Sequence, residues 1–411
     1  MSRVSSKAGL LGLGKVGTNV LLQHSYAADR FQFHWVSDSK RIYQSRRSVG
    51  FTKKDCAKIL KIKRQSSKLP QAPNFNIYEF ENLSQQVTIL RDLTSNDKQD
   101  WVMFDTTFTQ TKNDYAIADA LMGCKAYCTA NKTPWADYDS CSKLFQKAEE
   151  SQTLLGLNCT VGVWLDQMEI IPVIMRNLIS GRVDFLKRDN SSLNLFFTKI
   201  YSGLTVEETI RDLEASGHLD LPGANALVTE VKDQTLKARI AENICGILCS
   251  IRPVPIKKPL IRSDGPKSID PHAIAEWHLS GRKRGNYPAL LSQINLDLTN
   301  LSLRCEVAFV ELADRHPLAR DFPGKCAMSI DTSGARFTWS REYSPGPKRL
   351  TCSGYGGAKK TAAKIIAEAN RSMALSYKKP HVFSSPLLVL SALEKNERAA
   401  KKLEKQISLK L

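Results

Sequence analysis

Three glycines near the N-terminus have the spacing of a phosphate-binding loop. Gly12, Gly14 and Gly17 stand in GLGKVG, after the apolar run AGLL and at the start of the helix-like segment KVGTNVLLQHS. In such a loop the first glycine makes the turn, the second lets the backbone approach a pyrophosphate, and the third allows close helix–strand packing. The helix N-terminus then faces the phosphates. This pattern predicts a dinucleotide site at Gly12, Gly14, Lys15, Val16 and Gly17; the alternative is a purely structural glycine turn.

An acidic residue follows at the distance expected for a ribose ligand. Asp38 lies about 20 residues beyond the loop, at the end of the β-prone segment FQFHWVSDS. Its carboxylate would favour NAD by accepting a hydrogen bond from the 2′-hydroxyl, whereas Lys40 and Arg41 can hold the 2′-phosphate of NADP. Either cofactor fits, and the charge balance of the chain tilts the choice slightly towards NADP.

The elements around these residues alternate between strand and helix. WVMFD predicts a strand that ends at Asp105, and YAIADALMGCKAYCTAN and FQKAEESQTLLGLNCTVG each predict a helix followed by a strand. This alternation is typical of a parallel sheet with crossover helices. After about residue 160 the pattern changes to longer helices, one with a capping box at Thr205 and Glu208, and to strands such as LRCEVAFVEL and ARFTWS. The sequence therefore predicts an α/β fold with a Rossmann-type domain and an α+β domain.

The charge of the chain favours anionic ligands. The 411 residues include 59 Lys and Arg against 41 Asp and Glu, a net charge of +18. The excess is concentrated between Arg41 and Lys68, where Asp55 is the single acid; the stretch is either a solvated face or an anion-facing loop. No recognition-helix signature supports nucleic acid, and no apolar run reaches the ~18 residues of a membrane span. Neither partner is expected.

The cysteines indicate a reducing compartment. There are ten, without a CxxC pair and without a histidine at zinc-finger spacing, and the N-terminal segment has no signal-peptide layout. Scattered cysteines in such a chain are typical of reduced thiols in the cytoplasm. We expect neither disulfides nor a structural metal.

Further motifs follow the glycine loop in a fixed order. They are Asp105-Thr106-Thr107, Thr129-Ala130-Asn131-Lys132, Asn158-Cys159-Thr160-Val161-Gly162, Asp233-x-x-x-Lys237, His316-Pro317-Leu318-Ala319 and a late loop with Gly354, Gly356 and Gly357. Their order and spacing resemble the homoserine dehydrogenase family over about residues 8–372. The resemblance rests on the whole set of motifs, because any one of them alone is weak evidence for the family.

The resemblance implies reversible, NAD(P)-dependent interconversion of L-homoserine and L-aspartate 4-semialdehyde, in the biosynthesis of threonine and methionine. It implies Lys237 as the acid/base group, Asp233 and Asp220 as substrate-binding acids, and Lys132 as a residue of the same site. Hydride transfer to an aldehyde carbon leaves an alkoxide, which needs a cation or proton donor within reach. Taken alone, Asp233 and Lys237 would be an i,i+4 surface pair that contributes roughly 0.3–0.5 kcal/mol. Lys132 would be a capping or solvated lysine, and Asp220 a loop acid.

The resemblance also implies how the cofactor is enclosed. Thr106, Thr107 and Lys132 would lie near the nicotinamide, and Gly354 and Gly356 in the loop that closes over it. The family has a monovalent-cation site that uses an acid where this chain has Asn158, together with backbone carbonyls near Val161 and Val163. Losing that carboxylate weakens the site without excluding it.

Three substrate-side motifs depart from the family pattern. Ser191 and Ser192 replace a Gly-Thr pair, Trp164 replaces a glycine, and the acidic loop reads Asp220-Leu221-Pro222-Gly223. Ser191 cannot replace a glycine that needs a positive φ. Two alternatives to homoserine dehydrogenase therefore stay open. One is an oxidoreductase of the same fold acting on another small amino or carbonyl acid, and the other is a non-catalytic nucleotide-binding homologue.

The resemblance finally sets the expected organisation. Residues 1–156 would form the dinucleotide-binding domain and residues 157–349 the substrate-binding and dimerisation domain of a homodimer. Residues 350–375 would return to complete the first domain, and residues 376–411 would be a basic tail, too short for a regulatory domain.

Overall fold

The structure is a computed structural model. It describes residues 6–24, 31–64, 74–95, 97–107, 113–161, 182–188, 191–216, 218–219, 225–254, 261, 263–297, 299–320, 327–332, 336–340, 361–362, 365–366 and 368–369. Trp164, Asp220, the late glycine loop and the basic tail lie outside these residues.

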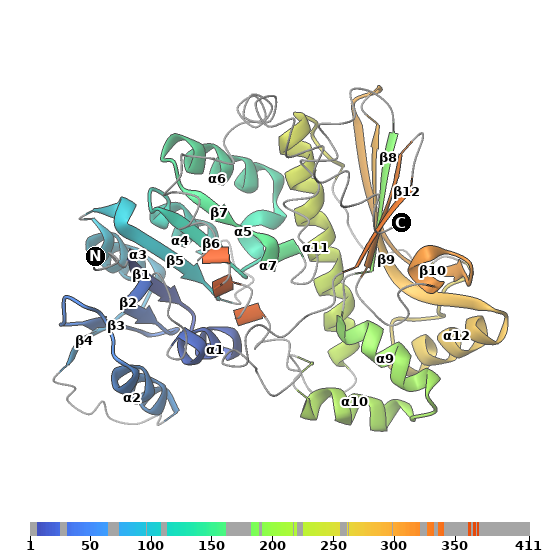
Figure 1. The fold of residues 1–411 in the computed structure, drawn as a ribbon, viewed down its shortest axis with the longest axis horizontal. Helices are drawn as coiled ribbons and strands as arrows, with labels where there is room; N and C mark the ends of the chain where they lie inside the picture. The colour runs from blue at the N-terminus through green and yellow to red at the C-terminus, as the bar shows by residue number, and fades with distance from the viewer. Residues whose placement is uncertain are drawn as a thin grey trace, which may run out of the picture.

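The first sheet is built around five parallel strands (Figure 1). They are β1 (Ser6–Leu11), β2 (Phe31–Ser37), β5 (Trp101–Asp105), β6 (Ala126–Thr129) and β7 (Leu154–Gly156). β1 lies between β2 and β5. In open α/β sheets a ligand binds where the strand order reverses in this way, beside the carboxyl ends of the strands. The α/β, Rossmann-type prediction is confirmed.

Two antiparallel strands extend this sheet at the β2 edge. β3 (Arg41–Ser45) pairs with β2, and β4 (Phe75–Glu79) pairs with β3. The basic stretch after Arg41 is thus neither one loop nor one solvated face, because β3 begins it and α2 (Lys53–Arg64) follows. Buried side chains explain the difference: Ile42 and Tyr43 on β3 and Ile59 on α2 are fully buried.

Helices cover both faces of the first sheet. They are α1 (Lys15–His24), α2, α3 (Leu83–Thr94), α4 (Asn113–Leu121), α5 (Thr133–Ala136) and α6 (Tyr138–Glu150), with a 3₁₀ turn at Lys98–Asp100. Successive strand residues point to opposite faces. Met103 accordingly packs with α3, α4 and α6, whereas the next residue, Phe104, packs with α1, α2 and the short pieces between residues 361 and 369.

The second sheet is antiparallel, in the order β10-β9-β8-β11-β12. Its strands are β8 (Arg182–Arg188), β9 (Asn286–Asp297), β10 (Ser302–Ala313), β11 (Ala327–Thr332) and β12 (Arg336–Ser340). Its helices are α9 (Ser191–Tyr201), α10 (Val206–Ala215), α11 (Asn225–Cys249) and α12 (Pro271–Lys283), with the single turns α7 (Asn158–Val161) and α13 (Pro317–Arg320). The capping box at Thr205 and Glu208 is confirmed at the start of α10.

The long helix α11 connects the two sheets. It contacts β9 and β10 on one side and α5, α6 and α7 on the other (Figure 1). The buried Asn243 side chain donates a hydrogen bond to the Trp135 carbonyl at 3.0 Å, which fixes α11 against α5. About two to three turns earlier on α11, Asp233 contacts Lys132, which follows the carboxyl end of β6. None of the described helices is long and apolar enough to span a membrane.

Candidate functional site

The glycine loop has the geometry that its spacing predicts. Gly12 has φ +82, a conformation that favours glycine. A Cβ at Gly17 would lie 1.9 Å from the Gly12 carbonyl oxygen, whereas a Cβ at Gly14 would meet no atom within 4 Å. The first and third glycines are therefore required by packing, and the second leaves open space beside the start of α1. The first turn of α1 carries no acid, so this space suits an anion.

Thr106 fastens this loop to the end of β5. Its hydroxyl lies 2.6 Å from the Gly12 carbonyl oxygen and 2.8 Å from that of Leu11. The hydroxyl of Thr107 donates to Asp105 at 2.6 Å. Both threonine hydroxyls are thus engaged inside the protein, so the predicted contact with a cofactor would fall to the backbone of this segment.

Asp38 shapes the turn between β2 and β3. Its Oδ1 accepts hydrogen bonds from the backbone N–H groups of Lys40 and Arg41, both at 2.8 Å. Its Oδ2 accepts one from the Tyr43 hydroxyl at 3.3 Å. The carboxylate that would favour NAD is therefore already satisfied by its own turn. Arg41 is directed to β4, where its Nε lies 3.2 Å from Glu79 Oε1.

A third cation near this turn was not foreseen. Lys63 lies on α2, and its pKa is lowered by partial burial while the carboxylate of Asp38 acts in the opposite direction. The sequence places Lys63 inside a basic run, and only the packing of α2 brings it close to Asp38. Lys40, Arg41 and Lys63 thus approach Asp38 from the turn, from β3 and from α2.

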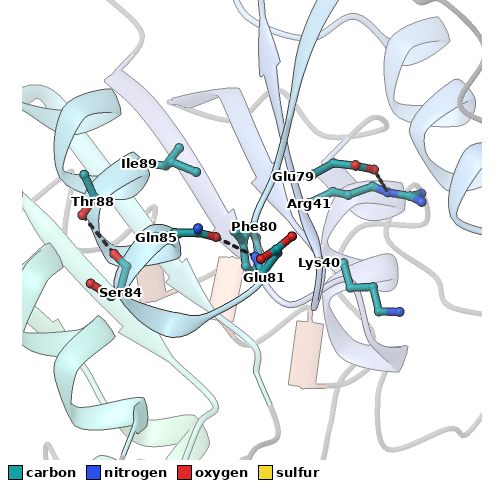
Figure 2. A pocket seen from close by; sticks show the side chains of 9 residues that line it. All are labelled: Lys40, Arg41, Glu79, Phe80, Glu81, Ser84, Gln85, Thr88 and Ile89. Carbon is teal, nitrogen blue, oxygen red and sulfur yellow. Dashed lines mark hydrogen bonds and ion pairs between the residues drawn. The ribbon is translucent and has the colours of Figure 1, made fainter.

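A hollow of about 550 Å³ lies between this turn and the start of α3 (Figure 2). Its lining residues are Lys40, Arg41, Glu79, Phe80, Glu81, Ser84, Gln85, Thr88 and Ile89. Figure 2 shows Lys40 extending from the turn, apart from the Arg41–Glu79 pair. The hollow combines one aromatic ring with two cations and with the carboxylates of Glu79 and Glu81, so the charges of its lining balance and Lys40 is the cation not paired with Glu79.

The predicted catalytic residues meet in a cluster of three charges. Lys132 Nζ lies 3.1 Å from Asp233 Oδ1, and Lys237 Nζ lies 2.6 Å from Asp233 Oδ2. Lys132 precedes α5 in the first domain, and the other two residues lie one turn apart on α11. Their side chains are only 14–22% exposed. This sheltered cluster replaces the simple exposed i,i+4 pair that the spacing alone would predict.

Electrostatics keep the carboxylate of this cluster ionised. Burial raises the pKa of Asp233, but the charges and hydrogen bonds of Lys132 and Lys237 lower it by more, so that its pKa lies well below the ordinary value of 3.8. Two ammonium groups on one carboxylate leave a net positive charge in a partly dehydrated place. Such a site can bind a carboxylate or stabilise an alkoxide.

The substrate-side departures are explained in part. Ser191 is the first residue of α9 and does not have a positive φ, so its position does not require glycine. Ser192 Oγ donates to the His218 carbonyl at 2.8 Å, which ties α9 to the segment just before Asp220. The Ser192 hydroxyl therefore acts within the protein framework.

Other predicted site residues cannot be placed together. Asp220, Val163, Gly354 and Gly356 lie outside the described residues. Asn158 and Val161 are the first and last residues of α7. Among the described residues no cluster of His, Cys, Asp and Glu could hold a metal ion. The monovalent-cation site stays a prediction.

Comparison with known proteins identifies the fold. No protein-family model and no curated protein matches the chain. Among solved structures, a protein of unknown function from Candida auris is 14% identical with a TM-score of 0.58, over 90% of this chain and 98% of that one. A putative homoserine dehydrogenase from Archaeoglobus fulgidus is 18% identical with a TM-score of 0.57, over 89% and 98%. A hyperthermophilic archaeal homoserine dehydrogenase in complex with NADPH is 16% identical with a TM-score of 0.54, over 90% and 98%. The chain has the homoserine dehydrogenase fold.

The three-charge cluster should make stability depend on pH. The pKa of Asp233 is lower in the folded protein than in the unfolded chain. The ionised carboxylate therefore stabilises the fold at a pH above its unfolded-state pKa, and this stabilisation is lost as the pH falls through its folded-state pKa. Asp233→Asn should therefore lower the free energy of unfolding by about 2 kcal/mol at pH 7. Urea unfolding from pH 7 to pH 2 should show this difference shrinking below about pH 4.

The matched control is Asp139→Asn, which removes an exposed pair with Arg252 at 3.0 Å and should change stability by less than about 0.5 kcal/mol. Equal effects of the two substitutions at pH 7 would contradict the account of the cluster.

Proposed function

We propose that the protein is an NAD(P)-dependent oxidoreductase that interconverts L-homoserine and L-aspartate 4-semialdehyde. The observation that carries this proposal is the cluster of Lys132, Asp233 and Lys237, with its surplus positive charge beside the glycine-loop domain. The solved homoserine dehydrogenases support it through the shared fold alone.

Lys237 is proposed as the proton donor and acceptor. When hydride reaches the aldehyde carbon of the semialdehyde, negative charge develops on the oxygen, and the Lys237 ammonium donates a proton to it. In the reverse direction the amine receives the hydroxyl proton of homoserine. Asp233 holds the lysine at 2.6 Å, and its charge keeps the ammonium in place. Lys132, held to the other oxygen of the same carboxylate, adds the positive charge that suits an amino-acid carboxylate.

A nicotinamide dinucleotide would supply or accept the hydride. Gly14 and the start of α1 would hold its pyrophosphate, because that side of the loop is open and free of acids. For the adenosine end we favour NADP. The Asp38 carboxylate is satisfied by its own turn. Lys40 of that turn and Lys63 of α2 would hold the 2′-phosphate, and Arg41, which is paired with Glu79, adds positive charge nearby.

The second sheet is the proposed place of homodimer contact. One face of this sheet packs on α11 through residues such as Ile294 and Val307. The opposite face carries the partly buried Leu186 and Val310. A partner subunit would cover that face.

A second function is a reaction of the same class on another small amino or carbonyl acid. Ser192 favours it, since its hydroxyl is engaged by the His218 carbonyl where the family pattern has threonine. The catalytic cluster would act in the same way on such a substrate.

Lys237→Ala should abolish turnover while cofactor binding persists. General acid–base catalysis by a positioned group contributes about 10²–10⁴-fold, so kcat for L-homoserine oxidation should fall by about 10³-fold. The measurement is formation of reduced nicotinamide followed by absorbance, with Kd for the cofactor measured in parallel.

Lys199→Ala is the control for that variant, because Lys199 also forms an ion pair, with Asp212 on α10, but far from the glycine loop in sequence and fold. Turnover of homoserine that survives in Lys237→Ala would contradict the proposed role. If neither the wild-type protein nor Lys237→Ala turns over homoserine while both still bind the cofactor, the second function is favoured.

The cations around Asp38 should discriminate between the two cofactors. Lys40→Ala and Lys63→Ala should each raise the Kd for NADP about tenfold, as expected for one charge-assisted hydrogen bond. The Kd for NAD should hardly change, since NAD lacks the 2′-phosphate. Isothermal titration with both cofactors measures this. Lys54→Ala, an exposed lysine on α2, controls for general charge, and an equal loss of NADP affinity in that variant would contradict a specific phosphate site.

A further inference from the structure

A buried carboxyl group lies where the strand order of the first sheet reverses. Asp105 is the last residue of β5 and is 1% exposed. Its Oδ2 accepts a hydrogen bond from the Tyr127 hydroxyl on β6 at 2.6 Å. Its Oδ1 accepts two from Thr107, from the backbone N–H at 3.0 Å and from the hydroxyl at 2.6 Å. This group has no part in the chemistry proposed above.

The hydrogen bonds continue from Asp105 to the residue before Lys132. Asn131 Nδ2 donates to the Thr107 hydroxyl oxygen at 2.8 Å and also, at 3.4 Å, directly to Asp105 Oδ2. Asn131 Oδ1 in turn accepts from the backbone N–H of Thr133 at 3.2 Å. Tyr127, Asp105, Thr107 and Asn131 therefore form one hydrogen-bonded network. Lys132 lies between Asn131 and Thr133, the two residues joined by the Asn131 side chain.

Because the Asp105 carboxylate can only accept hydrogen bonds, it fixes which group donates in each of the following contacts. The Thr107 hydroxyl has one proton, which points to Asp105, and so its oxygen accepts from the Asn131 amide. The amide must then present its oxygen to Thr133. Burial raises the pKa of Asp105, against the hydrogen bonds from Thr107 and Tyr127 that lower it. The ionised form thus depends on these donors, because a buried acceptor left without a donor is costly.

The side chain of Lys132 makes no contact that caps its own helix. Lys132 is the N-cap residue of α5, and its side chain extends instead to Asp233 on α11. Its backbone carbonyl accepts a hydrogen bond from the Trp135 N–H at 3.2 Å, and the backbone on its other side is continuous with Asn131. Asn131, which is 2% exposed, is the neighbour whose side chain is held on both sides.

We propose that Tyr127 and Asp105 are positioning residues for Lys132. Acting through Thr107 and Asn131, they hold the Lys132 ammonium against Asp233 and so keep the three-charge cluster assembled between the first sheet and α11. The consequence for catalysis rests on the proposed function; the consequence for the position of Lys132 does not.

The first test measures the position of Lys132 without any substrate. Lys132 is 16% exposed and paired, so a dilute amine-reactive reagent should modify it slowly in the wild-type protein. Tyr127→Phe removes one donor to Asp105 and should raise the modification rate of Lys132 several-fold, measured by peptide mass spectrometry. Lys147, which is 39% exposed and paired with Asp119, is the internal reference and should react at an unchanged rate. An unchanged rate at Lys132 overturns the proposal.

A second pair of variants separates the hydrogen bond from the shape of the side chain. Thr107→Val removes the hydroxyl that makes the shorter of the two links between Asp105 and Asn131 and should also expose Lys132, whereas Thr107→Ser keeps the hydroxyl and should restore protection. Thr153→Val is the matched control, because this buried hydroxyl accepts the Gly123 N–H at 2.8 Å at the opposite end of the strands. Equal exposure of Lys132 in Thr153→Val would indicate general loosening and overturn the proposal.

The kinetic readout tests the consequence for catalysis. In Tyr127→Phe, kcat should fall about 10- to 100-fold, the scale of a misplaced catalytic group, while KM for the cofactor stays within about twofold. If the wild-type protein does not turn over homoserine, the proposed function fails, and the rate of Lys132 modification still decides this inference.

Discussion

The candidate site depends on one carboxylate held between two ammonium groups. Asp233 contacts Lys132 at 3.1 Å and Lys237 at 2.6 Å, and the three side chains are largely sheltered from water. At such exposure an unpaired charge is costly, so each member requires the others. The pair of lysines on one carboxylate also leaves a positive charge, which is the property needed where an alkoxide forms.

The fold serves to bring these three residues together. Lys132 follows the carboxyl end of β6, where residues of a parallel sheet meet their ligands, and α11 presents Asp233 and Lys237 to it. The Asn243–Trp135 hydrogen bond fixes α11 against α5. The glycine loop is set in the same way, because Thr106 ties it to β5 at the neighbouring strand end. Cofactor loop and charge cluster thus depend on the same row of strand ends.

Local patterns in the sequence were sufficient for the parts of the site that are local. The glycine spacing, the one-turn spacing of Asp233 and Lys237, and the capping box at Thr205 depend on a few neighbouring residues, and the structure has these geometries. Contacts between distant segments were not accessible in this way. Periodicity does not show that Lys63 approaches Asp38 or that Tyr127 donates to Asp105, since both contacts arise from packing. The turn contacts of Asp38 were not visible in the spacing for a related reason: a carboxylate beside a tight turn can bind its own backbone as readily as a ribose.

The account is tested most directly by the crystal structure of the protein with NADP and L-homoserine. It predicts the substrate hydroxyl within hydrogen-bond distance of Lys237 Nζ, about 2.7–3.2 Å, with Asp233 still in contact with Lys237. A homoserine hydroxyl that lies away from Lys237, or a ligand bound without contact to the cluster, would contradict the central claim that these three charges form the active site.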